Sequence, residues 1–89
     1  MKIKITKHAF ERGKERLGLN KKALSRMAQE VFDQGSTTHD YAGELKRYLL
    51  RVQAIHKSRL RIHGHHAYAF KGENLITILH IPTKFHGAL

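Results

Sequence analysis

The sequence predicts a single α+β domain over residues 1–89. A short N-terminal strand and two or three helices come first, followed by a three-stranded antiparallel meander with the helices packed on one sheet face. Two patterns predict this class, because apolar residues recur at helical spacing up to residue 56 and then alternate with a period of two from Ser58. The length agrees with it, since 89 residues bury only enough surface for one core.

The first elements are a strand and a helix. Residues 2–6, KIKIT, alternate lysine and isoleucine as a half-buried edge strand does. Thr6 is the expected N-cap of a helix that runs to about Leu17 and ends at Gly18. The polar face of this helix carries His8, Arg12, Glu15 and Arg16.

Two further apolar stripes predict the remaining helices. Asn20 is the expected N-cap of the second helix, which Gly35 ends. Residues 36–44 form a polar loop, and a third stripe then runs from Leu45 to Ile55 or His56. The other face of this third helix carries Lys46, Arg47 and Arg51.

Three strands are predicted over residues 59–63, 66–71 and 75–81. Gly64 and His65 fit a two-residue hairpin loop, Gly72 marks the next turn, and Pro82 ends the last strand. Residues 83–89 form a short, flexible tail that is expected to pack only through Phe85.

The hairpin loop fixes which side chains share a face of the sheet. Leu60, Ile62, Ala67 and Ala69 are expected to face the core, so Arg59, Arg61, His63, His66, Tyr68 and Phe70 face away from it. A two-residue loop at Gly72 and Glu73 adds Ile76, Ile78 and His80 to the core face, and Leu75, Thr77 and Leu79 to the exposed one. A three-residue loop reverses this, and the sequence leaves both open.

The charge balance predicts a polyanionic partner. Seventeen lysines and arginines face seven acids, for a net charge of +10, which favours binding to RNA or DNA. A solvated basic surface without a specific partner is the alternative. The chain has no cysteine, no apolar signal-peptide core and no membrane-length apolar run, so we expect a cytoplasmic protein that does not bind membranes.

The sequence HGHH at residues 63–66 raises the question of a metal site. His63 and His66 share a strand face, but a structural zinc site usually needs four ligands. Only Asp40 and Glu73 are candidates to complete it, and their spacing does not support this. We therefore predict no metal and no other cofactor.

Metal-independent RNA cleavage requires fewer groups. The 2′-hydroxyl of RNA is an internal nucleophile, so the protein supplies only a base, an acid and a cation that stabilises the phosphorane. Histidine, arginine and tyrosine can fill these roles, and the first helix and the meander contain all three. An exposed Tyr68 would also offer a ring on which a base can stack.

The segments ITKHAFERGKERLGL and RIHGHHAYAFKGENLITILHIP resemble a group of small phage and bacterial proteins. These begin with a His-Ala-x-x-Arg-x-x-Glu-Arg-like helix and end with a Leu-[VI]-Thr-[VI]-Leu strand, and their layout is similar to the RelE and barnase–EndoU–colicin class of metal-independent ribonucleases. The resemblance implies a site between the first helix and the sheet. From this resemblance, the predicted catalytic residues are His8, Arg12, Arg61, His63 and Tyr68. The predicted nucleic-acid-binding residues are Arg16, Arg59, His66, Lys71 and Thr77.

Other functions remain open on the sequence. The same basic surface suits a non-catalytic module that binds nucleic acid or a host nucleic-acid complex. A third alternative is an inhibitor that binds another protein. A cognate antitoxin or a host protein is an expected partner, and the sequence does not indicate an oligomeric state.

Overall fold

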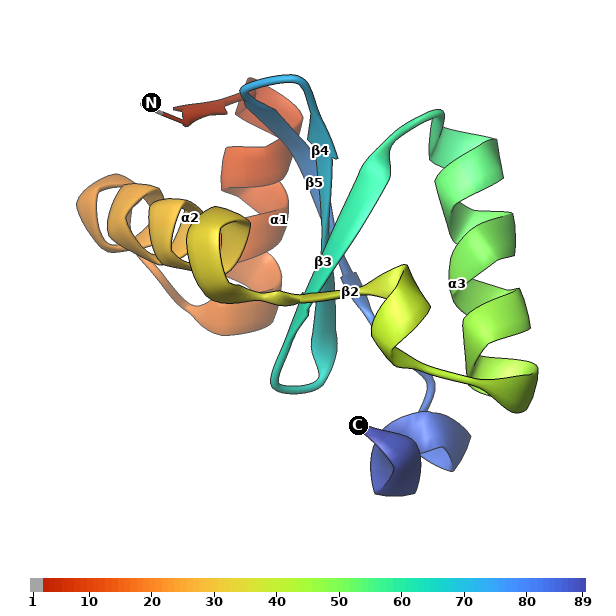
Figure 1. Cartoon of the computed structure of the whole chain (residues 1–89). Coiled ribbons are helices and arrows are strands. Elements are labelled where there is room, and N and C mark those ends of the chain that lie inside the picture. The colour runs from red at the N-terminus through yellow and green to blue at the C-terminus, as the bar shows by residue number, and fades with distance from the viewer. Residues whose placement is uncertain (1–2) are drawn as a thin grey trace.

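The computed structural model describes residues 3–89 as one five-stranded mixed sheet with helices against it (Figure 1). The strands are β1 (Lys4–Ile5), β2 (Ser36–Thr37), β3 (Arg59–His63), β4 (His66–Lys71) and β5 (Asn74–His80), in the order β1-β5-β4-β3-β2. The central three form the predicted antiparallel meander, β1 adds to β5 in parallel, and β2 adds to β3 antiparallel. The predicted α+β class is confirmed. Of the strand predicted at residues 2–6, residue 2 lies outside the described part.

The first two helices begin directly after the N-caps that the sequence predicts, and the third begins within the expected loop. They are α1 (Lys7–Leu17), α2 (Lys21–Gln34) and α3 (Gly43–His56), with the 3₁₀ helices η1 (Thr38–Asp40) and η2 (Thr83–Ala88). Thr6 and Asn20 are confirmed as N-caps, because each side chain accepts a hydrogen bond from the backbone N–H three residues later. Gly18 ends α1 in the left-handed conformation, at φ +66°.

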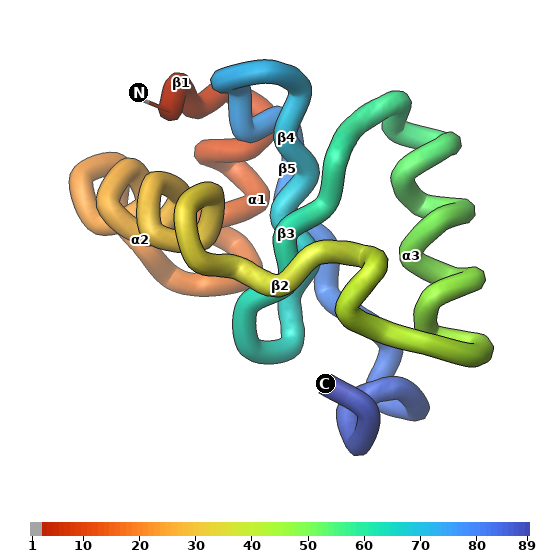
Figure 2. Tube along the Cα trace, viewed as in Figure 1, coloured from red at the N-terminus to blue at the C-terminus, as the bar shows by residue number. Residues whose placement is uncertain are grey.

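Helices lie on both faces of the sheet, so the prediction that they pack on one face is wrong (Figures 1 and 2). Helices α1 and α2 pack on the face that contains Tyr68, Phe70, Leu75 and Ile78. On the other face, α3 packs on Leu60, Ile62, Ala67 and Ala69. Both sheet faces carry large apolar side chains, and each must be covered to exclude water.

The first hairpin has the predicted register. Residues His63 and His66 are paired across the Gly64–His65 loop, and Leu60, Ile62, Ala67 and Ala69 are all buried as expected. The prediction of an exposed opposite face is wrong at Tyr68 and Phe70, which are 1% and 2% exposed. Strand alternation correctly separates the two faces, but it does not reveal that α1 and α2 cover the second one.

A β-bulge alters the register of the second hairpin. The two-residue turn at Gly72 and Glu73 is present, because Lys71 pairs with Asn74. Phe70 then pairs with Leu75, but Ala69 pairs with Thr77, so Ile76 is an extra residue in β5. This shift places Ile78 opposite Tyr68, His80 opposite His66 and Leu79 opposite Ala67, which reverses the assignment that a regular two-residue hairpin predicts for these three residues.

The remaining segments depart from the prediction in small ways. The expected loop at 36–44 contains β2, η1 and the start of α3. Ile55 is 69% exposed, so the half-buried His56 continues the apolar stripe of α3. Residues Thr83–Ala88 form η2, and Phe85 is buried as predicted. The expectation that the tail packs only through Phe85 is wrong, because Leu89 packs against the same core and His86 hydrogen-bonds the Ile81 carbonyl oxygen. Within residues 3–89, none of the helices combines the length and apolar character that crossing a bilayer requires.

Candidate functional site

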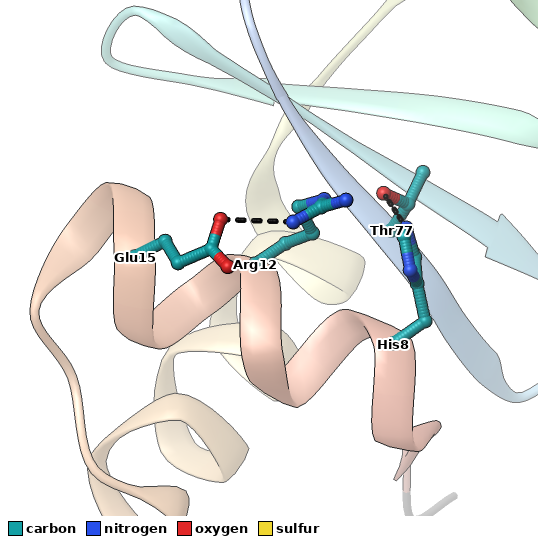
Figure 3. A network of polar contacts seen from close by, with 4 residues as sticks. All are labelled: His8, Arg12, Glu15 and Thr77. Carbon is teal, nitrogen blue, oxygen red and sulfur yellow. Dashed lines mark hydrogen bonds and ion pairs between the residues drawn. The ribbon is translucent and has the colours of Figure 1, made fainter.

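His8 connects the first helix to the sheet (Figure 3). The Thr6 cap starts α1 and places His8 in its first turn, where His8 Nε2 shares a hydrogen bond of 3.1 Å with Thr77 Oγ1. Thr77 is buried and lies at the bulge of β5, whereas the His8 side chain is exposed. The hydrogen bond therefore places the Thr77 side chain on the α1 side of the sheet.

Arg12 lies one helical turn after His8 and is already paired with an acid (Figure 3). Arg12 Nη1 donates to Glu15 Oε2 over 2.8 Å, and the two side chains are 32% and 61% exposed. An exposed pair of this kind is weak, because water and salt screen it. Arg12 is thus accessible to a phosphate, which would compete with Glu15 for the guanidinium.

Two histidines face each other where β4 and β5 meet the α1 side of the sheet. The rings of His66 and His80 have their centres 5.2 Å apart and are inclined by 70°. Burial lowers the pKa of His66 below the usual 6.5, and the nearby charges of His80, His65, Arg16 and His86 lower it further. The lowered pKa favours the neutral form of His66, which can accept a proton, while His80 is exposed to solvent.

The C-terminal 3₁₀ helix adds to this arrangement. His86 of η2 stacks on His65 with ring centres 3.9 Å apart, and its ring centre lies 5.3 Å from that of His80. His86 Nε2 also hydrogen-bonds the Ile81 carbonyl oxygen at 2.7 Å, which orients the ring. We call His65, His66, His80 and His86 the histidine cluster. In the part of the chain that the structure describes, no three His, Asp or Glu side chains are arranged to hold a metal ion.

The other predicted residues of the sheet do not join His8. Arg61 Nη1 donates to the Gly35 carbonyl oxygen over 3.2 Å, and its guanidinium carbon lies 5.9 Å from the centre of the Phe32 ring. Buried Tyr68 stands between Arg61 on β3 and Ile78 on β5. The predicted convergence of His8 and Arg61 on one scissile bond is therefore wrong.

Tyr68 is also unsuited to the role predicted for it. It is 1% exposed, and burial raises the pKa of its hydroxyl above the usual 10.0. The ring is enclosed by core residues and offers no surface to a base, so the prediction of an exposed stacking ring is wrong.

The remaining predicted residues are dispersed. Arg59 is exposed on β3 and lines, with Arg61, Phe32 and Phe70, a pocket of about 410 Å³. His63 is exposed at the hairpin loop, and Lys71 is exposed at the opposite end of the meander. These positions suit contacts with a long polyanion, but they do not form one site.

Sequence reasoning included His66 but missed the rest of the histidine cluster. It left the face of His80 open between a two-residue and a three-residue loop at Gly72, treated His65 as a turn residue and placed His86 in a flexible tail. The pairing of His66 with His80 depends on the bulge at Ile76. A single extra residue in so short a strand cannot be recognised from the alternation of apolar and polar residues.

Comparison of the chain with protein-family models, curated proteins and solved structures finds no match. The resemblance to the RelE class stays a prediction. The histidine cluster and the adjoining face of α1 therefore carry the functional assignment.

Proposed function

We propose that the chain binds RNA and cleaves it at the histidine cluster without a metal ion. One observation carries the proposal: His66 and His80 are 5.2 Å apart, with the charge of Arg16 close enough to act on His66. Two imidazoles at this separation can both reach one phosphodiester, and Arg16 can neutralise its charge.

The proposed chemistry gives the two histidines different roles. Neutral His66 accepts the proton of the 2′-hydroxyl, and the 2′-oxygen attacks the adjacent phosphorus. His80 acts as the acid and donates a proton to the 5′-oxygen as the bond from phosphorus to that oxygen breaks. The products are a 2′,3′-cyclic phosphate and a 5′-hydroxyl, and Arg16 stabilises the extra negative charge of the phosphorane.

The face of α1 beside the cluster supports binding of the flanking strand. His8 and Arg16 are exposed, and Arg12 is held only by its weak pair with Glu15. Together with the net charge of +10, these groups favour phosphates near the cluster. A cytoplasmic location, where RNA is abundant, is part of this proposal.

The direct test of this chemistry is the requirement for a 2′-hydroxyl. A fluorescent RNA should be cleaved in the presence of EDTA, and its 2′-deoxy counterpart should bind but stay intact. Cleavage of both substrates would show that the internal nucleophile is not used and would overturn the proposed mechanism.

A non-catalytic nucleic-acid-binding module is the second candidate function. It is favoured by the wide spread of cations, since Arg59 and Lys71 lie at the end of the meander opposite the His63–His66 pair. A binding module uses such dispersion to contact many phosphates. Tight binding of RNA without cleavage would support this function. Protein partners such as a cognate antitoxin or a host protein stay predictions.

A further inference from the structure

A second concave surface lies on the α3 side of the sheet, away from α1 and α2. Helices α3 and η2 border a pocket of about 650 Å³, within the range of small-molecule sites. Its lining includes three cations, two aromatic rings and one acid, which are Arg47, Arg51, Lys84, Tyr48, Phe85 and Glu44. Figure 1 shows η2 below the N-terminal end of α3.

The two aromatic side chains that line this pocket pack against each other. Tyr48 and Phe85 have ring centres 5.3 Å apart and are inclined by 36°, and Phe85 is 9% exposed. Lys84 Nζ lies 5.0 Å from the centre of the Phe85 ring. Tyr48 is only half-buried, so part of its ring remains accessible.

The cations of the pocket are not neutralised by the protein. Within residues 3–89, the ion pair between Arg12 and Glu15 is the only one, so Glu44 pairs with none of the three cations beside it. Arg47 and Arg51 are exposed and lie one turn apart on the same face of α3. The pocket thus combines an accessible ring with an excess of positive charge.

We propose that this pocket binds a nucleotide of a single-stranded nucleic acid. The base contacts the Tyr48 ring, and Arg47, Arg51 and Lys84 bind the flanking phosphates. A single strand is favoured over a duplex, because only an unstacked base can enter a pocket of this size. An acidic protein segment would satisfy the cations but would leave the ring without a stacking partner.

The position of η2 connects this pocket with the histidine cluster. Lys84 and Phe85 line the pocket, and the next residue, His86, stacks on His65. An RNA strand with one nucleotide in the pocket can therefore continue along η2 to the histidine cluster. The inference rests on the RNA-binding part of the proposed function and is independent of cleavage.

The test compares two double variants that remove the same charge from equivalent helical positions. Arg47→Ala with Arg51→Ala alters the pocket, and Lys22→Ala with Arg26→Ala removes two exposed cations of α2, on the other sheet face. Fluorescence polarisation of a short single-stranded RNA measures binding between about 50 and 200 mM salt. The pocket variant should bind at least about tenfold more weakly than the control, and its salt slope should fall by about 1.4, for two lost phosphate contacts on a single strand.

Equal weakening in both double variants would overturn the proposal, because it would show that only total charge matters. Lys84→Ala provides a second variant outside α3 and should weaken binding in the same direction. Poly-L-glutamate serves as a competitor. If it displaces the RNA at equal charge concentration and Arg47→Ala with Arg51→Ala abolishes binding of both, the pocket binds acidic protein instead.

The binding experiment is separable from the cleavage proposal. Binding of the 2′-deoxy oligonucleotide, which the proposed chemistry does not cleave, measures the effect of the pocket whether or not the parent cleaves RNA. If the parent does not cleave RNA but the pocket variant binds more weakly than the control variant, the pocket proposal stands and the cleavage proposal fails. If the parent cleaves RNA but the two double variants bind equally well, the pocket proposal fails and the cleavage proposal stands.

Discussion

His66 on β4 and His80 on β5 face each other because Ile76 forms a β-bulge, an extra residue that shifts the pairing of the two strands by one position. Without the bulge, β5 would place Leu79 opposite His66, and His80 would lie on the other sheet face. Thr77 lies beside the bulge and contacts His8, on the face where a regular two-residue hairpin also places it. The inserted residue thus brings His80 to the α1 side of β5, consistent with the frequent occurrence of bulges beside functional sites.

The pKa of His66 predicts a dependence of stability on pH. Because its pKa is lower in the folded chain than the usual 6.5, the unfolded chain binds more protons once the pH falls through about 6.5. His66 should therefore lower the free energy of unfolding as the pH falls from about 6.5 to its folded pKa, with no such loss above that window. Urea unfolding of the parent and of His66→Gln at a series of pH values measures this contribution. An identical pH dependence in both proteins would show that His66 does not contribute.

Arg61 is expected to support the fold rather than catalysis. Arg61→Ala removes the hydrogen bond to the Gly35 carbonyl and the contact with the Phe32 ring, so the free energy of unfolding should fall by roughly 1–2 kcal/mol. Cleavage by the folded variant should stay within a few-fold of the parent. Denaturant titration and the RNA assay test the two statements separately. If Arg61→Ala is as stable as the parent but cleaves RNA a hundredfold more slowly, Arg61 takes part in catalysis and this prediction is wrong.

Gly35 is a second support of the same region. A Cβ atom at this position would lie 2.5 Å from the Val31 carbonyl oxygen and 3.2 Å from Arg61 Cβ, so the backbone would have to shift. Gly35→Ala should destabilise the chain by about 1–3 kcal/mol. Gly87→Ala is the matched control, because a Cβ there meets open space. Thermal unfolding should show a lower Tm for the first variant and little change for the second.

Substitution of His8 distinguishes between two possible locations of the cleavage site, the histidine cluster and the contact between α1 and β5. If the histidine cluster cleaves RNA, His8→Ala loses one partly exposed hydrogen bond to Thr77 and a contact to the strand, so cleavage should fall by less than about tenfold. A loss of roughly two to four powers of ten is typical of an acid–base group. Such a loss in His8→Ala, with parental activity in His66→Gln, would place the site between α1 and β5 instead.

The sequence was sufficient for the local features of this fold. Thr6 and Asn20 as caps, the Gly64–His65 loop and the burial of Leu60 and Ile62 each follow from a short pattern with a direct physical cause. The burial of Tyr68 was not predictable in this way, because alternation shows which residues share a face but not whether a helix covers it.

The candidate site was predicted less well for a related reason. His8, Arg12 and Thr77 do come together on α1 and β5, which the helical and strand patterns allowed. The approach of His80 to His66 required the bulge, and that of His86 required η2 to fold back on the hairpin. Both are tertiary features without a periodic signal in the sequence.

Cleavage at the histidine cluster is tested by the single-turnover rate of RNA cleavage in EDTA by the parent, His66→Gln and His80→Gln. Each substitution should lower the rate by about two to four powers of ten, while oligonucleotide affinity and the folded structure are retained. The parent should leave a 2′,3′-cyclic phosphate. Cleavage at the parental rate by both variants would contradict the assignment of the histidine cluster.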